Sequence, residues 1–456
     1  MEFNLENKKV LVVGAGKSGL AAAQLLVAKG ADVQITDLKT LEDLNIDEKI
    51  FSEKVTCLFG QEYLEYYKNA ELIVVSPGVP FNQKGLSAAR ALNREIIGEM
   101  ELASRFINRP ILAVTGSNGK TTTTSLTGEI LTQNLGAAPF VGGNIGNPLA
   151  NLALLEVKGE PVPAWAVIEV SSFQLETVKD FKALGAAFLN LSPDHLDRHG
   201  DLDEYFKVKF RIFNNQNSCD WGIVNEDDPY LAAAKVKGVR FGFSRVKKPE
   251  FGGFIQKVGS DEILSVVEGA KVLAEAKWSS FLLTGAHNQE NVLAAVGLAL
   301  AAGVKPEAAL LVAQKFAPGD HRLQLVKEIK GVRFFDDSKG TNVGAVARAL
   351  ESFSSPVVLI AGGRDKGLDF SYLRPFVQNR VKDLVLIGES RHKMGAALKG
   401  AAPIHLADSL DEAVKVAATL ASPGEIVLLS PACASFDQFK DYKDRGDSFA
   451  RAVHNL

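Results

Sequence analysis

Residues 111–134 read ILAVTGSNGKTTTTSLTGEILTQN, which is an apolar run, a turn containing glycine and a helical pattern. The run Ile111–Thr115 predicts a buried strand, and Thr121–Asn134 predicts a helix. The turn between them places a lysine after a glycine and before two threonines. Backbone amides and such a lysine bind phosphates, and a threonine hydroxyl can bind Mg²⁺. The stretch therefore predicts a phosphate loop in an α/β domain. Val114 replaces the first glycine of the strict Walker A spacing, and a chance turn containing Gly-Lys is the alternative.

A second glycine-rich turn lies near the N-terminus, where GAGKSG (residues 14–19) follows the apolar run Lys9–Gly14 and opens the helical pattern Ser18–Lys29. Asp37 follows Gly19 by 18 residues, at the end of the next predicted strand. This spacing matches the dinucleotide fingerprint, in which glycines let the backbone approach a diphosphate. Any diphosphate nucleotide, including a UDP-sugar, satisfies the pattern. A tight turn without a ligand is the alternative.

Apolar runs alternate with helical patterns along the whole chain, which predicts α/β units with parallel sheets. Residues 239–284 are an exception and predict antiparallel strands. A segment with proline and glycine, Lys315–Arg322, is the predicted hinge. Further strands are expected at Asp32–Asp37, Glu71–Pro77, Ala166–Val170, Ala186–Leu191, Val332–Asp336, Val357–Gly362, Leu384–Gly388 and Ile426–Ser430. A chain of 456 residues suggests about three domains.

The composition narrows the class of protein. The net charge of -3 provides no basic field for nucleic acid or an acidic membrane. The three cysteines form no CxxC pair, which argues against a disulfide framework or a zinc site. The longest apolar run, from Val292 to Val304, is shorter than the roughly 20 residues that span a bilayer. We therefore expect a cytoplasmic protein with small-molecule partners, without nucleic acid or membrane insertion, and with a buried helix at this run.

Several polar residues stand beside predicted strands or helices, each with an ordinary alternative. Glu169 ends a buried strand, where it could bind Mg²⁺ or be a solvated charge. DHLDRH (residues 194–199) follows another strand, as a metal site or a polar loop. Lys209 lies on the next predicted helix, and local physics does not select it over Lys207. Asn288 and Asn291 share a helix face and could contact a nucleoside or cap the helix.

Taken together, these motifs resemble those of the Mur ligases. GSNGKTT, IEVSSFQLE, DHLDRHG, HN..N, HR, DDSKGTN, GGRDKG and SPACASFDQF occur in the family's order, and the resemblance extends from Gly14 to Gly446. The C-terminal motifs are similar to those of members that add D-glutamate, and the DNPR-type motif of the diaminopimelate- or lysine-adding member is absent. The resemblance implies an ATP-dependent ligase that joins D-glutamate to UDP-N-acetylmuramoyl-L-alanine through an acyl phosphate. It also implies a role in peptidoglycan synthesis, and so in cell shape and division. A sibling or folylpolyglutamate-type ligase is the alternative.

The resemblance further implies three domains and a set of site residues. The expected domains are 1–98, Rossmann-like and UDP-binding; 99–317, P-loop ATPase-like with added antiparallel strands; and 318–456, Rossmann-like and amino-acid-binding. The expected UDP-substrate residues are Gly14, Ala15, Gly16, Lys17, Ser18, Asp37, Ser76, Pro77, Gly78 and Asn144. The expected ATP residues are Gly116, Ser117, Asn118, Gly119, Lys120, Thr121, Thr122, Asn288, Asn291, Arg322 and Asp337. The expected D-glutamate residues are Lys339, Lys366, Ser435 and Phe436.

Four residues are the expected catalytic groups: Lys120, Glu169, His195 and Lys209. The resemblance implies two Mg²⁺ ions, one held by Thr121 and Glu169 and one by His195 with a carbamylated Lys209. We expect a monomer. Two rival classes remain at this point. An NAD-dependent dehydrogenase would use only the glycine turn of residues 14–19. An ATP-gated binding protein would have no role for Glu169, His195 and Lys209.

Overall fold

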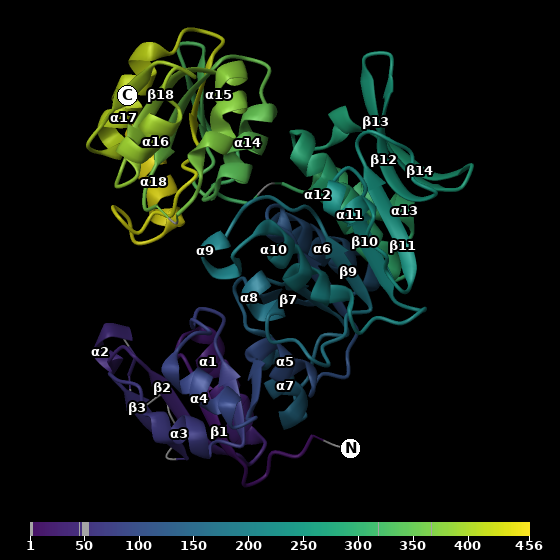
Figure 1. Ribbon diagram of the computed structural model, residues 1–456. Helices are drawn as coiled ribbons and strands as arrows, with labels where there is room; N and C mark the ends of the chain where they lie inside the picture. Colours follow the sequence, from purple (N-terminus) through teal and green to yellow (C-terminus); the bar gives the residue numbers. More distant parts are fainter. Residues whose placement is uncertain (1–2, 45, 48–53, 318, 366) are drawn as a thin grey trace.

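The N-terminal sheet is entirely parallel. The computed structural model describes residues 3–44, 46–47, 54–317, 319–365 and 367–456, and Figure 1 shows three α/β parts in them. The first sheet has the order β3-β2-β1-β4-β5. Its strands are β1 (Lys9–Val13), β2 (Asp32–Asp37), β3 (Val55–Phe59), β4 (Leu72–Val75) and β5 (Glu95–Gly98). The strand order reverses between β1 and β4, and a ligand crevice is usual at such a switch point.

The central sheet combines parallel and antiparallel strands in the order β14-β13-β12-β11-β10-β9-β6-β8-β7. The predicted antiparallel strands of residues 239–284 are confirmed for β12 to β14, which pair antiparallel with one another. The prediction is wrong for β11, which pairs in parallel with β10 and β12. The strands are β6 (Ile111–Thr115), β7 (Phe140–Gly143), β8 (Ala166–Glu169), β9 (Gly185–Phe188), β10 (Trp221–Asn225), β11 (Val239–Ser244), β12 (Phe251–Val258), β13 (Asp261–Glu268) and β14 (Lys271–Lys277).

The C-terminal sheet has the order β15-β16-β20-β17-β18-β19. Only its edge strand β15 is antiparallel to its neighbour, β16. The strands are β15 (Gln324–Ile329), β16 (Val332–Asp336), β17 (Val357–Gly362), β18 (Val381–Ile387), β19 (Ile404–Leu406) and β20 (Ile426–Leu429). The parallel sheets confirm the predicted α/β class. The boundaries expected at 98/99 and 317/318 remain predictions, and residue 318 lies outside the described residues.

Helices pack around these sheets because their apolar faces need cover. The first are α1 (Lys17–Ala28), α2 (Leu41–Leu44), α3 (Leu64–Asn69), α4 (Lys84–Ala91), α5 (Glu99–Ser104), α6 (Lys120–Leu135) and α7 (Leu149–Lys158). The next are α8 (Ser172–Leu175), α9 (Leu196–His199), α10 (Leu202–Phe210), α11 (Pro229–Ala232), α12 (Ala286–Ala301) and α13 (Pro306–Lys315). The last are α14 (Val343–Glu351), α15 (Arg374–Arg380), α16 (Arg391–Ala397), α17 (Leu410–Leu420) and α18 (Tyr442–His454). The predicted buried helix is α12, in which residues 291–299 are all buried. Within the described ranges, no helix is both long and apolar enough to cross a membrane.

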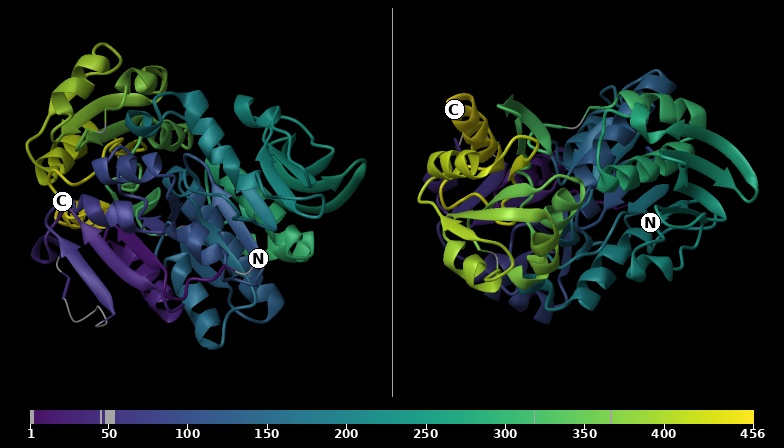
Figure 2. Two further views of the ribbon diagram at one scale, coloured as in Figure 1. Left: turned by 60° about the horizontal axis from the view of Figure 1, so that its bottom comes forward. Right: turned by 90° about the horizontal axis from the view of Figure 1, so that it is seen from above.

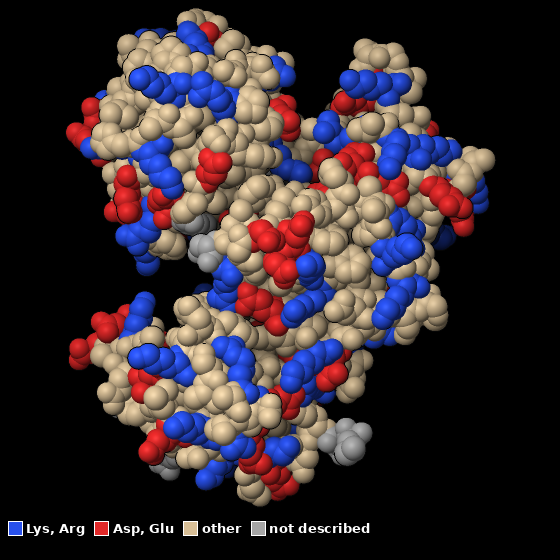
Figure 3. All heavy atoms as spheres, in the orientation of Figure 1, with Lys and Arg blue, Asp and Glu red and all other residues tan. Residues whose placement is uncertain are grey.

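The N-terminal and C-terminal parts lie on the same side of the central part (Figure 2). The molecule is hollowed between them, and lysine, arginine and acidic side chains are interspersed over the visible face (Figure 3). This distribution agrees with the small net charge of -3.

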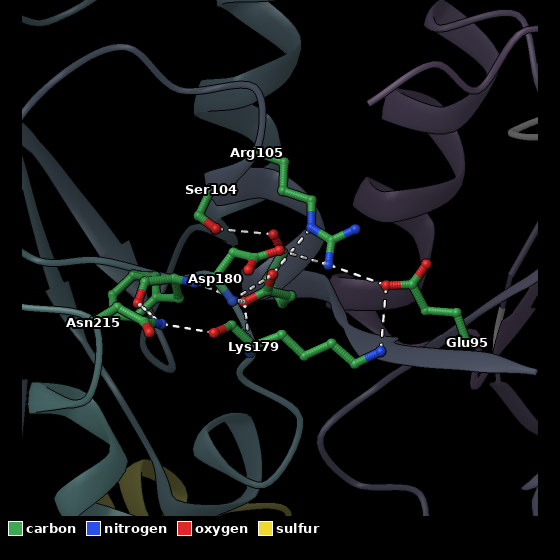
Figure 4. A network of polar contacts seen from close by, with 8 residues as sticks. Glu95, Ser104, Arg105, Lys179, Asp180 and Asn215 are labelled. Carbon is green, nitrogen blue, oxygen red and sulfur yellow. Dashed lines mark hydrogen bonds and ion pairs between the residues drawn. The ribbon is translucent and has the colours of Figure 1, made fainter. Parts of the chain in front are cut away.

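A network of ion pairs braces the N-terminal part against the central part (Figure 4). Arg105 follows α5 and lies 3.1 Å from Glu95 on β5, 3.0 Å from Glu101 and 3.2 Å from Asp180. The Glu101 side chain is fully buried, and it also accepts hydrogen bonds from the backbone N–H groups of residues 179–181. Because a buried carboxylate needs such partners, the network ties β5 and α5 to the loop after α8.

Candidate active site

The phosphate loop joins β6 to α6, as predicted. Gly119 has a φ of 85°, and a Cβ there would lie 2.2 Å from Asn291 Oδ1, so only glycine fits. Lys120 is the first residue of α6, and its Nζ donates to the carbonyl oxygens of Gly116 at 2.8 Å and Ser117 at 2.9 Å. Burial lowers the pKa of Lys120 from its usual value. The lysine thus lies folded over the loop, where a phosphate could draw it away from the carbonyls.

Residues after β9 fix the shape of this loop. Ser117 Oγ donates to the Ser192 carbonyl at 2.9 Å. Asn190 accepts from the Asn118 N–H at 2.9 Å and donates to the Asn118 carbonyl at 3.1 Å. We did not predict Asn190 or Ser192 as site residues. Their only signal in the sequence is that polar residues directly follow a buried strand.

Glu169 forms hydrogen bonds with a residue at the start of α6 and with one just after β7. It ends β8 and is only 3% exposed. Its carboxylate accepts from Thr121 Oγ1 at 2.7 Å and from Asn144 Nδ2 at 2.8 Å. The alternative that Glu169 is a solvated strand-end charge is therefore wrong. The carboxyl ends of β6, β7 and β8 converge here.

Burial separates the two lysines of α10. Lys209 is 1% exposed, and its Nζ donates to the Gly116 carbonyl at 3.0 Å. Burial, and then the charge of Lys120, lower the pKa of Lys209 well below its usual value. Lys207 is exposed and forms a 2.7 Å ion pair with Glu204. Burial therefore distinguishes Lys209 from Lys207, which the local sequence could not do.

The loop before α9 brings a carboxylate and an imidazole to the same region. His195 has a left-handed backbone with φ of 54°, and its Nε2 lies 3.6 Å from Asp194 Oδ2. Asp194 is buried, and its Oδ2 accepts from Asn342 Nδ2 of the C-terminal part at 3.0 Å. Asp194 Oδ1 is buried without a hydrogen-bond partner in the described part of the chain. Asp194 was not among our predicted site residues.

The oxygen-rich groups of this region suit a hard divalent cation. The Thr121 hydroxyl and the Glu169 carboxylate meet at 2.7 Å, beside the phosphate loop. The unpartnered Asp194 oxygen is a further acceptor that a cation or its water could satisfy. No cluster of three His, Cys, Asp or Glu side chains with metal-site geometry occurs among residues 3–44, 46–47, 54–317, 319–365 and 367–456.

A cleft of about 530 Å³ opens at the switch point of the N-terminal sheet. Ser76 Oγ donates to the Gly14 carbonyl at 2.8 Å, and Asp37 accepts from the N–H groups of Ala15 at 2.9 Å and Lys39 at 3.0 Å. Ala15 contributes this backbone contact and does not line the cleft. The other expected UDP-substrate residues line it: Gly14, Gly16, Lys17, Ser18, Asp37, Ser76, Pro77, Gly78 and Asn144.

A second, narrower pocket lies between the central and C-terminal parts. Its lining includes Asn118, Gly119, Thr122, Asn288, Asn291, Arg322, Asp337 and Lys339. The predicted shared face of Asn288 and Asn291 is confirmed by a 3.0 Å hydrogen bond between their side chains. Burial lowers the pKa of Arg322. Burial also raises the pKa of Asp337 to about 7, although its 2.7 Å bond from Ser430 opposes this shift.

The expected D-glutamate residues are only partly brought together. Lys339 lines the second pocket, and its Nζ donates to Tyr442 Oη at 3.0 Å. Ser435 is buried, Phe436 is 62% exposed, and neither is among the residues that line this pocket. Lys366 lies outside the described residues.

Comparison with known proteins gives one consistent result. The chain matches a Mur ligase MurD-like N-terminal domain over residues 8–98, a Mur ligase middle domain over 114–299 and a Mur ligase, glutamate ligase domain over 321–433. A relative from Geotalea uraniireducens is 44% identical over 465 residues, which cover 100% of this chain and 99% of the relative. One from Acidobacterium capsulatum is 45% identical over 454 residues, with 99% and 97% covered. Both are named UDP-N-acetylmuramoylalanine–D-glutamate ligase.

Solved structures agree at the level of the fold. The MurF ligase of Thermotoga maritima in complex with ADP has a TM-score of 0.62 at 15% identity, covering 100% of this chain and 97% of that one. MurC of the same organism has a TM-score of 0.60 at 19% identity, covering 98% and 99%. With three domain models and full-length relatives in agreement, the chain belongs to the Mur ligase family of ATP-dependent, amide-bond-forming ligases.

Proposed function

We propose that this protein joins D-glutamate to UDP-N-acetylmuramoyl-L-alanine at the expense of ATP, in the synthesis of peptidoglycan precursors. The names of the full-length relatives support the choice of substrates. We further propose that it acts in the cytoplasm as a monomer, on small molecules alone, and that cell shape and division depend on its product.

One observation carries the proposal most strongly. Glu169 accepts from Thr121 on the phosphate loop and from Asn144 in the N-terminal cleft, at 2.7 and 2.8 Å. A nucleotide phosphate beside Thr121 and a substrate carboxylate beside Asn144 would therefore flank one carboxylate. Such proximity is what phosphoryl transfer from one bound ligand to the other requires.

The residues of this site suit a two-step reaction. In the first step the terminal carboxylate of the UDP-substrate attacks the γ-phosphorus of ATP, the bond to the bridging oxygen breaks, ADP leaves and an acyl phosphate forms. Lys120 would leave its loop carbonyls to hold the phosphate charge. Mg²⁺ held by Thr121 and Glu169 would neutralise further charge on the transferring group. In the second step the amine of D-glutamate attacks the acyl phosphate, and inorganic phosphate leaves as the amide forms. Closure of the C-terminal part over this region would exclude water, which would otherwise hydrolyse the acyl phosphate.

We also propose that Lys209 is carbamylated and, with His195, serves a second Mg²⁺. Lys209 is buried, and no carboxylate lies within ion-pairing distance of it among the described residues. A buried unpaired cation is costly, whereas a carbamate would present oxygen to a hard cation. His195 lies on the neighbouring loop beside Asp194.

The C-terminal part is proposed to bind D-glutamate and to close onto ATP about Lys315–Arg322. Lys339 would supply the charge for a D-glutamate carboxylate, and Ser435 a hydrogen bond. Losing one charge-assisted hydrogen bond costs roughly 1.5–3 kcal/mol. Lys339→Ala should therefore raise the Michaelis constant for D-glutamate about 10-fold or more. If only the constant for ATP rises, Lys339 belongs to the nucleotide pocket that it lines.

The decisive experiment measures phosphate release with ATP, Mg²⁺, UDP-N-acetylmuramoyl-L-alanine and a panel of amino acids. D-glutamate should support turnover, and L-glutamate, L-alanine, L-lysine and diaminopimelate should not. Lys120→Ala should abolish release while leaving the fold intact. Turnover with another amino acid would assign the protein to a sibling activity. Tight NADH binding in the N-terminal cleft would instead favour a dehydrogenase.

A further inference from the structure

Arg198 connects the central part to the N-terminal part with both ends of its guanidinium group. Its Nε and Nη2 donate to the Glu176 carboxylate at 2.9 and 2.6 Å. Its Nη1 points the other way and donates to the carbonyl oxygens of Pro77 at 3.4 Å and Val79 at 3.2 Å. Glu176 follows α8 in the central part, whereas Pro77 and Val79 line the N-terminal cleft. The fixed fork of donors lets one side chain hold both parts at once.

Two aromatic rings extend this contact in both directions. The guanidinium carbon lies 4.4 Å from the ring centre of Phe173 on α8 and 5.7 Å from that of Phe81 in the N-terminal part. The Phe173 ring also lies 4.7 Å from the His195 ring, centre to centre. A continuous set of contacts therefore runs from the wall of the N-terminal cleft, through Arg198 and Phe173, to His195.

We propose that Arg198 is a positioning residue that couples filling of the N-terminal cleft to the placement of the His195 loop. The inference rests on the proposed function, because it takes the UDP-sugar to be the ligand of that cleft. A UDP-sugar that packs against residues 77–79 would fix the two carbonyls that Arg198 binds. Arg198 and Phe173 would then hold His195 where ATP and its Mg²⁺ need it. By linkage, each ligand tightens the binding of the other by the same factor.

The chain offers a matched control. Arg109 also pairs with a glutamate, lying 3.2 Å from Glu156 through its Nε. This pair lies within the central part and is more exposed, with the arginine side chain 45% accessible against 18% for Arg198. Arg109→Lys therefore repeats the chemical change of Arg198→Lys away from the cleft wall.

The experiment measures the dissociation constant of a non-hydrolysable ATP analogue with Mg²⁺ by calorimetry, with and without saturating UDP-N-acetylmuramoyl-L-alanine. In the unaltered protein the UDP-sugar should tighten the analogue about 5-fold or more. Arg198→Lys keeps the charge but loses the fork, and Phe81→Leu removes the ring on the N-terminal side. The factor by which the UDP-sugar tightens binding of the ATP analogue is the gain, and it should fall below about 2-fold in both variants. The dissociation constant measured without UDP-sugar should stay unchanged. Arg109→Lys should keep the full gain.

The outcomes separate the inference from the function on which it rests. If the unaltered protein binds neither ligand, the proposed function fails. If it binds both without coupling, or if Arg198→Lys and Phe81→Leu keep the full gain, the inference is overturned and the proposed function stands. If Arg198→Lys weakens the ATP analogue equally with and without the UDP-sugar, Arg198 acts only within the central part, which also overturns the inference.

Discussion

Replacing Glu169 with glutamine should remove a charge from the site while preserving its hydrogen bonds. The carboxylate is 3% exposed and accepts from Thr121 at 2.7 Å and from Asn144 at 2.8 Å. In Glu169→Gln the amide oxygen can still accept from Asn144. The new NH₂ group can donate to the Thr121 hydroxyl, because a hydroxyl can rotate from donor to acceptor. Both existing contacts then keep one donor and one acceptor.

The substitution should change the stability of the fold little and the turnover strongly. Hydrogen bonds to a charged group contribute about 1.5–3 kcal/mol and neutral ones about 0.5–1.5 kcal/mol, so the exchange weakens both bonds. Burying an amide instead of a carboxylate offsets part of this loss. The free energy of unfolding should therefore change by about 1 kcal/mol. Glu169 would act on the transferring phosphate through the Mg²⁺ that it helps to hold, and removing one preorganised electrostatic group typically lowers turnover by roughly 10²–10³-fold.

The assay is phosphate release over a range of Mg²⁺ concentrations, with chemical unfolding measured in parallel. Glu156→Gln is the matched control, since Glu156 pairs with Arg109 away from the phosphate loop and should keep normal turnover. Near-normal turnover of Glu169→Gln at low Mg²⁺ would show that Glu169 has no role in phosphoryl transfer. Unfolding of the variant would instead refute the argument that its hydrogen bonds can be exchanged.

Three further predictions follow from buried ionisable groups. Lys209→Ala should be almost inactive and partly restored by a small added carboxylic acid, whereas Lys207→Ala, at an exposed position, should turn over normally; equal activities in a phosphate-release assay would contradict the proposed carbamate. Arg105→Ala takes the cation from the buried Glu101 carboxylate, which keeps its backbone hydrogen bonds, and should cost about 1.5–3 kcal/mol in chemical unfolding; a loss below about 0.5 kcal/mol would mean that the brace is not stabilising. Burial raises the pKa of Glu99 to about 7, so its contribution to stability falls as the pH rises from about 4.5 to 7. Glu99→Gln should therefore gain roughly 3 kcal/mol over the unaltered protein at pH 8 and nothing at pH 4, which unfolding curves at the two pH values would test.

The buried strands were predictable from the sequence as elements, and four of them to the residue. Asp32–Asp37, Ile111–Thr115, Val332–Asp336 and Val357–Gly362 were expected with the bounds that the structure has. Such strands are short apolar runs between turn signals. We did not predict the edge strand Gln324–Ile329. It has no buried residue, so its sequence QLVKEI carries neither an apolar run nor a clear alternation.

Some residues of the candidate site could be predicted because they are close in the sequence, whereas others are brought together only by the fold. The phosphate loop is a local motif, and its residues lie together because they are neighbours in the chain. Lys209 needed a fold to distinguish it from Lys207. A helical face offered a weak signal, since Tyr205 and Lys209 are four residues apart and both are buried. Asp194 stood in the DHLDRH motif, but the sequence did not indicate its contact with Asn342, which lies 148 residues away in another part of the molecule.

Asn342 supports the proposed closure of the C-terminal part onto the ATP site. Its Oδ1 accepts from the Ala345 N–H at 2.8 Å and so caps α14, while its Nδ2 donates to Asp194 at 3.0 Å and Asn118 at 3.3 Å. An outward movement of the C-terminal part would break both interdomain bonds. Asp194 would then lose its hydrogen bond from Asn342, and Asn118 one of the contacts that fix the phosphate loop. Docking therefore shapes the loop that would hold ATP and also covers it. If the C-terminal part closes as proposed, one movement would place the side chains for the phosphates and also exclude water, which a hydrolysable acyl phosphate requires.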